Sequence, residues 1–408
     1  MNCRHCTRPL TNTFLDLGFA PPSNAYLSST DLSKPEKYFP LKIMVCESCW
    51  LVQTQDYAQA DELFTSDYAY FSSTSVTWLK HSADYAEKII HELGLNSKSL
   101  VIEVASNDGY LLKNFVQAGI PCLGIEPTEN TAIAAEKFSI PVLREFFGAS
   151  LGRRLAAEGK QADLIVGNNV FAHVPDINDF TQGIKEALKP GGTVTLEFPH
   201  LLCLINQTQF DTVYHEHFSY LSLSTVCKIF ETAGLRVWNV DELSTHGGSL
   251  RIYGCHMADE RAVTANVRAV IEKESEYQLS SLITYQNFQI RADAIKNELL
   301  LFLIQAKKLG KKVAAYGAAA KGNTLLNYAG VKPDLLEFAC DQALSKQKKF
   351  MPGSHIPIFS PDILRHRKID YLLILPWNLV NEVKSQNSFL TDTGVKFVTA
   401  VPSLKIHD

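Results

Sequence analysis

From residue 78 onward, helical segments alternate with short apolar runs, and this alternation constrains the fold more than any other feature of the chain. The helices are predicted at 78–94 and 110–118, and the apolar runs lie at 99–105, 121–126, 162–167 and 193–198. This spacing is typical of a doubly wound, mainly parallel α/β sheet. Two further runs, at 235–240 and 249–255, have no helix between them, which predicts an antiparallel hairpin that closes the sheet.

The C-terminal part of the chain predicts a second, smaller α/β domain. Residues 262–308 are rich in Glu, Lys, Leu, Ile and Ala, which indicates long helices. A helix at 323–329 then follows the first of four predicted strands, at 312–316, 336–340, 371–375 and 396–400. With 408 residues the chain is too long for one ordinary core, and we expect three domains, at 1–70, 71–260 and 261–408.

Four of the nine cysteines form two Cys-x-x-Cys pairs near the N-terminus, namely Cys3 with Cys6 and Cys46 with Cys49. Four thiolates match the tetrahedral preference of structural zinc. A redox dithiol is the alternative, and His5 competes as a ligand because it lies between the first two cysteines. Four sulfurs leave no open coordination position, so we expect one structural zinc that is remote from any chemistry.

Composition excludes several classes of partner and location. A formal net charge of -4 argues against nucleic-acid binding, because neutralising phosphates needs a basic surface. No apolar run approaches the roughly 20 residues that span a bilayer, and the first residues contain no apolar segment of a secretory signal. We therefore expect a cytoplasmic protein without a membrane partner.

The turn after the first apolar run indicates which cofactor the parallel sheet holds. Glu126 ends the second run, 23 residues after Glu103, where an acid can bond both hydroxyls of an adenosine ribose. The turn contains Asn107, Asp108 and Gly109 instead of the glycine-rich pattern that a pyrophosphate needs. Asp108 would repel a pyrophosphate but accept a bond from an ammonium group. S-adenosylmethionine therefore fits best, and the alternative is an ordinary turn without a ligand.

Two more stretches favour the same cofactor. Glu145 and Phe146 lie in a stretch where aromatic rings could hold the adenine. Asn168, Asn169 and His173 follow the third apolar run, at the edge of the sheet where α/β proteins bind ligands. A histidine at this edge is a candidate catalyst, although a structural histidine is the plainer interpretation.

Tyr214, His215, Glu216 and His217 put a phenol, two imidazoles and a carboxylate on successive positions. A packed core rarely holds such a run, because each buried polar group needs a partner. Proton transfer at neutral pH does use it, since a carboxylate can orient and tune an imidazole. The alternative is a polar surface loop.

Taken together, these motifs resemble the sugar C-methyltransferases of deoxysugar biosynthesis, typified by C-3′-methyltransferases that act on nucleotide-linked 4-keto sugars. The resemblance covers essentially the whole chain and also includes the segments 68–74, 246–251 and 317–322. It implies a Rossmann-like methyltransferase domain between the zinc-binding and C-terminal domains. It further implies that His217 is the base, that Tyr214 and Glu216 are its partners, and that His173 and Tyr68 line the same cavity.

The resemblance also implies that a dTDP- or GDP-linked sugar lies between the middle and C-terminal domains. Tyr70, His215, His246 and Lys321 are the candidate contacts to this substrate. The turn at 317–322 would hold the pyrophosphate, with Lys321 adding a positive charge, unless it is a plain structural turn. His215 remains a rival of His217 for the role of base.

The residues also predict the chemistry. A carbon beside a ketone becomes a nucleophile when a base such as His217 removes its proton and a donor such as Tyr214 stabilises the enolate oxygen. The carbanion then attacks the sulfonium methyl group, which requires no metal and no second copy of the chain, so we expect a monomer. The alternatives are methylation of oxygen or nitrogen on another small acceptor, and a zinc-knuckle binding module without activity.

Overall fold

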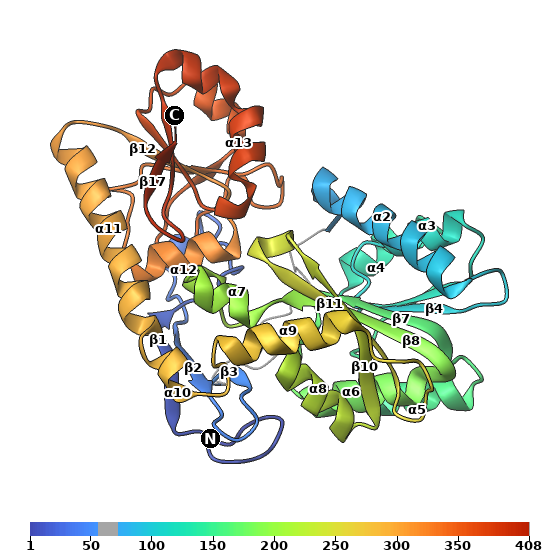
Figure 1. Ribbon diagram of the computed structural model, residues 1–408. Coiled ribbons are helices and arrows are strands. Elements are labelled where there is room, and N and C mark those ends of the chain that lie inside the picture. Colours follow the sequence, from blue (N-terminus) through green and yellow to red (C-terminus); the bar gives the residue numbers. More distant parts are fainter. Residues whose placement is uncertain (56–71, 408) are drawn as a thin grey trace.

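The computed structural model describes residues 1–55 and 72–407 (Figure 1). Its N-terminal part forms a four-stranded sheet with the order β1-β2-β3-β9. The strands are β1 (Asn12–Ala20), β2 (Phe39–Val45), β3 (Val52–Thr54) and β9 (Ser219–Tyr220). The fourth strand comes from far along the chain, since Val52 pairs with Tyr220. Tyr68 and Tyr70, predicted at the site, lie outside the described residues.

The middle part forms a seven-stranded sheet with the order β10-β11-β8-β7-β4-β5-β6. Its strands are β4 (Val101–Val104), β5 (Cys122–Ile125), β6 (Val142–Leu143), β7 (Ala162–Asn168), β8 (Leu188–Pro199), β10 (Leu235–Leu243) and β11 (Ser249–His256). Strands β4 to β8 pair in parallel, whereas β11 runs antiparallel to both β8 and β10. The predicted doubly wound sheet and its closing hairpin are therefore confirmed. The strand order reverses beside β4, where such sheets bind ligands at their carboxyl ends.

Helices cover both faces of this sheet, and in Figure 1 α2, α3 and α4 lie on one side and α5, α6 and α8 on the other. They are α2 (Val76–Leu93), α3 (Leu112–Gln117), α4 (Glu129–Glu136), α5 (Ala149–Ala157), α6 (Ile177–Ala187) and α8 (Leu223–Thr232). Successive residues of β4 serve opposite cores, because Val101 packs with the first group of helices and Ile102 with the second. Burial on both faces explains why these strands are almost continuously apolar.

The predicted long helices are α9 (Ala265–Glu276) and α11 (Phe288–Lys308), with the short α10 (Leu282–Gln286) between them. They lead into a six-stranded sheet with the order β14-β13-β12-β15-β16-β17. Its elements are β12 (Val313–Tyr316), α12 (Ala320–Tyr328), β13 (Ala339–Cys340), β14 (Ile358–Phe359), β15 (Tyr371–Ile374), α13 (Val380–Gln386), β16 (Lys396–Thr399) and β17 (Lys405–His407). Helix α12 begins three residues before the predicted 323, so Lys321 lies in its first turn.

One hydrophobic core joins the N-terminal sheet to the C-terminal part, where Phe14 of β1 lies against Phe288 of α11 at 4.5 Å between ring centroids. Helix α7 (Leu201–Asn206) contributes to the same core. The other helical segments of the described residues are short 3-10 turns at Asp31–Ser33, Ser72–Thr74, Phe171–His173, Phe210–Thr212, Thr245–Gly247, Pro361–Arg365, Trp377–Leu379 and Ser388–Thr393. Within residues 1–55 and 72–407, no helix has both the length and the apolar character needed to cross a membrane.

A buried ion pair fixes α9 to the middle part of the chain. The Glu274 carboxylate is 1% exposed and accepts hydrogen bonds from the backbone N–H groups of Leu223, at 2.6 Å, and Ser224, at 2.9 Å. His200 Nε2 lies 2.8 Å from the same carboxylate. Burial alone would lower the pKa of His200, but hydrogen bonds with Cys203 and Glu274 raise it to about 9. At neutral pH the imidazole is therefore charged.

We expect Glu274→Gln to destabilise the fold by about 3–5 kcal/mol, because it leaves a buried imidazolium without its counter-charge. In the wild type, the raised pKa of His200 means that the pair stabilises fully below pH 6.5 and is lost as the pH rises through about 9. Urea unfolding at several pH values measures both effects. Glu272→Gln, a change at an exposed residue two positions before Glu274 on the same helix, is the control. Equal urea midpoints for the two variants would contradict this prediction.

Candidate active site

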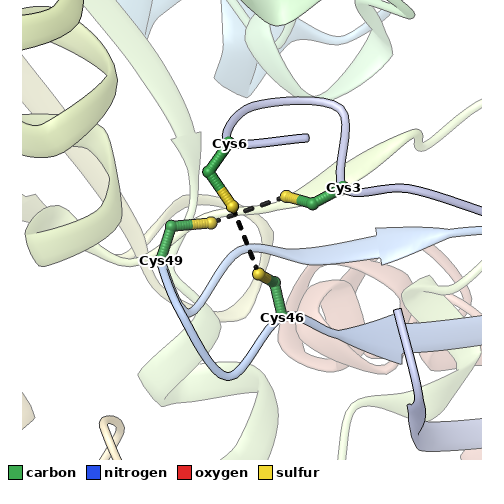
Figure 2. A group of neighbouring side chains, drawn as sticks. All are labelled: Cys3, Cys6, Cys46 and Cys49. Atoms are coloured by element: carbon green, nitrogen blue, oxygen red, sulfur yellow. Dashed lines mark hydrogen bonds between the residues drawn. The ribbon is translucent and has the colours of Figure 1, made fainter. Parts of the chain in front are cut away.

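The four cysteines of the two predicted pairs meet at one end of the N-terminal sheet (Figure 2). All four sulfur atoms lie within 4.8 Å of one another, with Cys3 and Cys49 at 3.5 Å and Cys6 and Cys46 also at 3.5 Å. A tetrahedral site with Zn–S bonds of about 2.3 Å has S···S edges of about 3.8 Å, so the cluster fits zinc. His5 turns away from the sulfurs, because its Nδ1 lies 2.8 Å from the Asn178 Oδ1 atom.

The turn after β4 needs glycine because it packs closely against neighbouring segments. Asn107 and Gly109 adopt left-handed backbone conformations, with φ of 48° and 77°. A Cβ atom at Gly109 would lie 2.6 Å from Ile140 Cδ1, so only glycine fits there. The Asn107 N–H donates to Glu126 Oε2 at 2.9 Å, which ties this turn to the acid that follows β5.

Acidic and unpartnered polar groups gather around this turn. Burial raises the pKa of Glu103 well above its ordinary value, and the nearby carboxylates of Asp108 and Glu126 raise it further. Among the described residues, neither Asp108 Oδ1 nor the side-chain amide of Asn168, at the end of β7, has a hydrogen-bond partner. A cationic ligand with its own donors fits such a cluster, and S-adenosylmethionine carries both a sulfonium and an ammonium group.

The predicted adenine contacts lie after β6. Phe146 is 62% exposed, and Glu145 bonds to Arg154 at 2.5 Å on the surface. Phe147 instead turns inward and meets Phe180 edge-on, with 5.4 Å between ring centroids. The stacking role of Phe146 stays a prediction.

The structure brings His173, Tyr214 and His217 together at the carboxyl edge of the seven-stranded sheet. Ring centroids lie 4.6 Å apart for His173 and His217, and 4.0 Å apart for Tyr214 and His217. His217 Nδ1 lies 3.0 Å from the Thr212 carbonyl oxygen, which can only accept, so Nδ1 carries the proton and Nε2 keeps its lone pair. Burial lowers the pKa of His217 well below its ordinary value, and that of His173 to about 4. Both imidazoles are therefore neutral at pH 7.

His215 and Glu216 point toward the N-terminal part of the chain. His215 Nε2 lies 3.3 Å from the Phe39 carbonyl oxygen, and its ring meets Phe39 edge-on at 6.0 Å. Both carboxylate oxygens of Glu216 accept from Asn24 Nδ2, at 2.8 and 2.9 Å. The side chains of residues 214–217 therefore lie in two different places: Tyr214 and His217 beside His173, and His215 and Glu216 against the N-terminal part of the chain.

Side chains from two other segments approach the imidazoles. The Asn169 amide donates to His246 Nε2 at 3.1 Å, and burial lowers the pKa of His246 to about 4. Lys321 donates to Asn378 Oδ1 at 2.8 Å and lies 4.8 Å over the Trp377 ring. The positive charge of Lys321 contributes to the low pKa values of both His217 and His246, so these groups are neighbours.

The glycines of the 317–322 turn have a packing role. A Cβ atom at Gly317 would lie 2.6 Å from Pro376, and one at Gly322 would lie 2.7 Å from Leu375. The close approach of the chain after β15 explains both glycines without a ligand. A pyrophosphate at this turn therefore stays a prediction.

Asp211 is a buried acid at the site that the sequence interpretation did not select. It is 0% exposed, and its Oδ2 accepts from the Trp377 indole N–H at 2.8 Å. Burial raises the pKa of Asp211 to about 6, against the opposing charge of Lys321. Its position in the sequence, three residues before Tyr214 in the same polar run, could have identified it as a candidate site residue. Asn24 and Trp377 had no comparable signal, because they lie in separate parts of the chain.

We expect Glu126→Ala to weaken S-adenosylmethionine binding by about 2–4 kcal/mol, because charge-assisted hydrogen bonds to the ribose would be lost. Calorimetry measures the change. Glu126 also holds the turn through Asn107, so Glu126→Gln, which keeps an acceptor there, should lose less. Glu129→Ala, an exposed change on α4, is the matched control. Unchanged affinity in Glu126→Ala would place the cofactor elsewhere.

Models of three domain families match the chain in succession. A zinc binding domain matches residues 3–64, a methyltransferase domain matches residues 78–240, and a C-methyltransferase C-terminal domain matches residues 244–402. An uncharacterised methyltransferase of Mycobacterium leprae is 30% identical over 99 residues, which are 24% of this chain and 36% of that protein. Magnesium protoporphyrin IX methyltransferase from Synechocystis PCC 6803, solved with bound SAH, is 15% identical, with a TM-score of 0.34 over 43% of this chain and 81% of that one.

The relative C-methyltransferase NovU of Streptomyces niveus matches over nearly the full length of both proteins. It is 32% identical over 404 residues, which are 99% of this chain and 96% of NovU. The matched domains agree with the cysteine cluster and with the acidic turn of the seven-stranded sheet. The chain therefore belongs to the C-methyltransferase family, with S-adenosylmethionine as its cofactor and zinc in its cysteine cluster.

Proposed function

We propose that this protein methylates a carbon, C-3′, beside the ketone of a nucleotide-linked 4-keto-6-deoxy sugar. The observation that carries the proposal is the buried, neutral imidazole of His217, whose Nδ1 is engaged by a backbone carbonyl while Nε2 keeps its lone pair. Such a group is a base that works without first losing a proton. The resemblance of the whole motif set to the sugar C-methyltransferases supports the class of acceptor.

The proposed reaction starts with proton transfer from the acceptor carbon to His217 Nε2. The electrons of the broken C–H bond pass to the ketone oxygen, where the Tyr214 hydroxyl donates a hydrogen bond to the enolate. His173, packed against His217, excludes water from the base, and Glu216, bound by Asn24, fixes the segment that carries Tyr214 and His217. S-adenosylmethionine, when bound, supplies an electrophilic methyl group to the enolate carbon. The acidic cluster of Glu103, Asp108 and Glu126 holds the cofactor in this scheme.

The C-terminal domain supplies the remaining contacts in the proposed complex. Lys321 and Trp377 extend from it toward His217 and His246, so an acceptor between the two domains would touch both. The sugar nucleotide, dTDP- or GDP-linked, would run from His246 and Lys321 toward the turn at 317–322. From the resemblance, we propose Tyr70 and His215 as further substrate contacts and Tyr68 as a cofactor contact. One chain carries all of these groups, which supports a monomer as the active unit.

An isotope experiment tests the proposal. The protein is incubated with methyl-labelled S-adenosylmethionine and each of a panel of dTDP- and GDP-linked 4-keto-6-deoxy hexoses. Mass spectrometry should detect one added methyl group, and NMR should place it on carbon beside the ketone. Without the cofactor, the hydrogen at that carbon should exchange with D₂O. A methyl group on oxygen or nitrogen, with no exchange, would favour the alternative methyltransferases, and no S-adenosylmethionine binding would favour an inactive zinc module.

A further inference from the structure

The zinc knuckle carries a side chain that reaches out of the N-terminal part of the chain. Arg4 lies between the ligands Cys3 and Cys6. Its Nη1 donates to the Pro175 carbonyl oxygen at 2.6 Å, and its Nη2 donates to the Thr54 carbonyl oxygen at 3.2 Å. The same guanidinium lies 5.4 Å over the Phe218 ring. A planar guanidinium, with donors in a fixed fork, is suited to hold several groups in one geometry.

The segments that Arg4 contacts are those that carry the two neighbouring imidazoles. Pro175 lies two residues after His173, and Phe218 directly follows His217. The Phe218 N–H donates to the Ala172 carbonyl oxygen at 2.8 Å, and the Thr54 N–H donates to the Phe218 carbonyl oxygen at 3.1 Å. A hydrogen-bonded path therefore runs from the N-terminal sheet through Phe218 to the segment of His173.

The knuckle itself is fixed against the same segments. The Arg4 backbone N–H donates to Gln53 Oε1 at 2.9 Å, and Gln53 Nε2 donates to Cys3 Sγ at 3.1 Å. Asn178 Nδ2 donates to the His5 carbonyl oxygen at 2.9 Å. The loop that holds the zinc ligands and the loop after His173 are thus bonded directly to each other. Zinc binding to Cys3 and Cys6 would hold the Arg4 backbone in place.

We propose that Arg4, fixed by the zinc knuckle, is a positioning residue that sets the approach of His173 to His217. It acts on the reaction through these two imidazoles and touches no reacting atom. The inference rests on the proposed role of His217 as the base. It replaces the expectation that the zinc site is remote from the chemistry, because the metal-binding loop and the imidazoles share the contacts of one guanidinium.

Arg4→Ala tests this role by separating proton abstraction from binding. We expect one zinc per chain and unchanged S-adenosylmethionine affinity, but about 10- to 100-fold slower exchange of the acceptor hydrogen in D₂O, since small misplacements of catalytic groups have effects of this size. Burial and the neighbouring His173 keep the pKa of His217 low. If Arg4→Ala moves His173 away, that pKa rises, and the pH below which exchange slows should therefore be higher than in the wild type. The other groups that lower the pKa of His217, His246 and Lys321, are left unchanged.

The controls separate positioning from stability. Arg8→Ala removes an exposed arginine from the same segment and should exchange like the wild type. Methylguanidinium should restore part of the exchange rate to Arg4→Ala. The exchange rate of Arg4→Lys should lie between those of Arg4→Ala and the wild type. Wild-type exchange with an unchanged pH profile in Arg4→Ala overturns the inference, as does an unfolded Arg4→Ala combined with full exchange in Arg4→Lys. No exchange in the wild type would instead refute the proposed function.

Discussion

Replacing His217 by asparagine is expected to slow exchange of the acceptor hydrogen about 10²–10⁴-fold, the usual effect of losing one general base. Asparagine keeps a donor toward the Thr212 carbonyl oxygen, so the fold and the binding of both substrates should persist. Proton NMR in D₂O follows the exchange, and calorimetry follows binding. In the wild type the rate should fall only well below pH 6.5, since burial lowers the pKa of His217 and the base remains neutral to lower pH.

Two neighbouring variants sharpen this experiment. His215→Asn is the matched control, because the His215 ring lies against Phe39 and not against His173. At saturating acceptor it should exchange at nearly the wild-type rate, with only the KM for the acceptor raised by loss of the proposed substrate contact. Tyr214→Phe should slow methyl transfer while leaving part of the exchange, since it removes an enolate partner and not the base. Normal turnover in His217→Asn, with collapse in His215→Asn, would reverse the two roles.

Replacing Cys46 by serine is expected to release the zinc and unfold the N-terminal sheet. Structural zinc sites contribute on the order of 10–16 kcal/mol of binding free energy to folding, which exceeds the stability of most domains. Cys46 directly follows β2, so both the knuckle and the adjoining strands depend on it. Metal analysis and hydrogen exchange of residues 12–54 measure the two losses.

Replacing a cysteine outside the cluster by serine separates the effect of losing zinc from the effect of losing a thiol. Cys227, a half-buried cysteine of α8 outside the cluster, is the control, and Cys227→Ser should retain one zinc per chain. Serine there should leave hydrogen exchange in β1 and β2 unchanged. A well-folded wild-type protein without metal, or with an iron–sulfur cluster, would contradict the zinc assignment.

Much of the fold could be predicted because its signals are local. Strands covered on both faces must be apolar along their length, so β4, β5 and β7 could be recognised from sequence alone. Each cysteine pair lies within one tight turn, which made the metal cluster visible. The predicted start of α12 is three residues too late, because Ala320 and Lys321 lie between two glycines and resemble part of a turn.

The parts of the site that could not be predicted depend on contacts between distant segments. Asp211 and Trp377 are 166 residues apart and meet only because the C-terminal domain packs against the middle one. Strand β9 has two residues, too few for a periodic pattern, and its partner belongs to the N-terminal sheet. The division of His215 from His217 follows from a tight turn, in which the His217 N–H donates to the Tyr214 carbonyl oxygen at 2.9 Å.

The pairing of β3 with β9 also has a consequence for synthesis of the chain. Thr54 and Phe218, which bond across this edge, are separated by 164 residues. At about 5–20 residues per second, a ribosome needs roughly 8–33 s to make that length, and during this interval the edge of β3 has no strand to cover it. An exposed strand edge is a template for pairing with other chains. Nascent or truncated chains that end before residue 219 should therefore be the species most prone to aggregate and most dependent on chaperones.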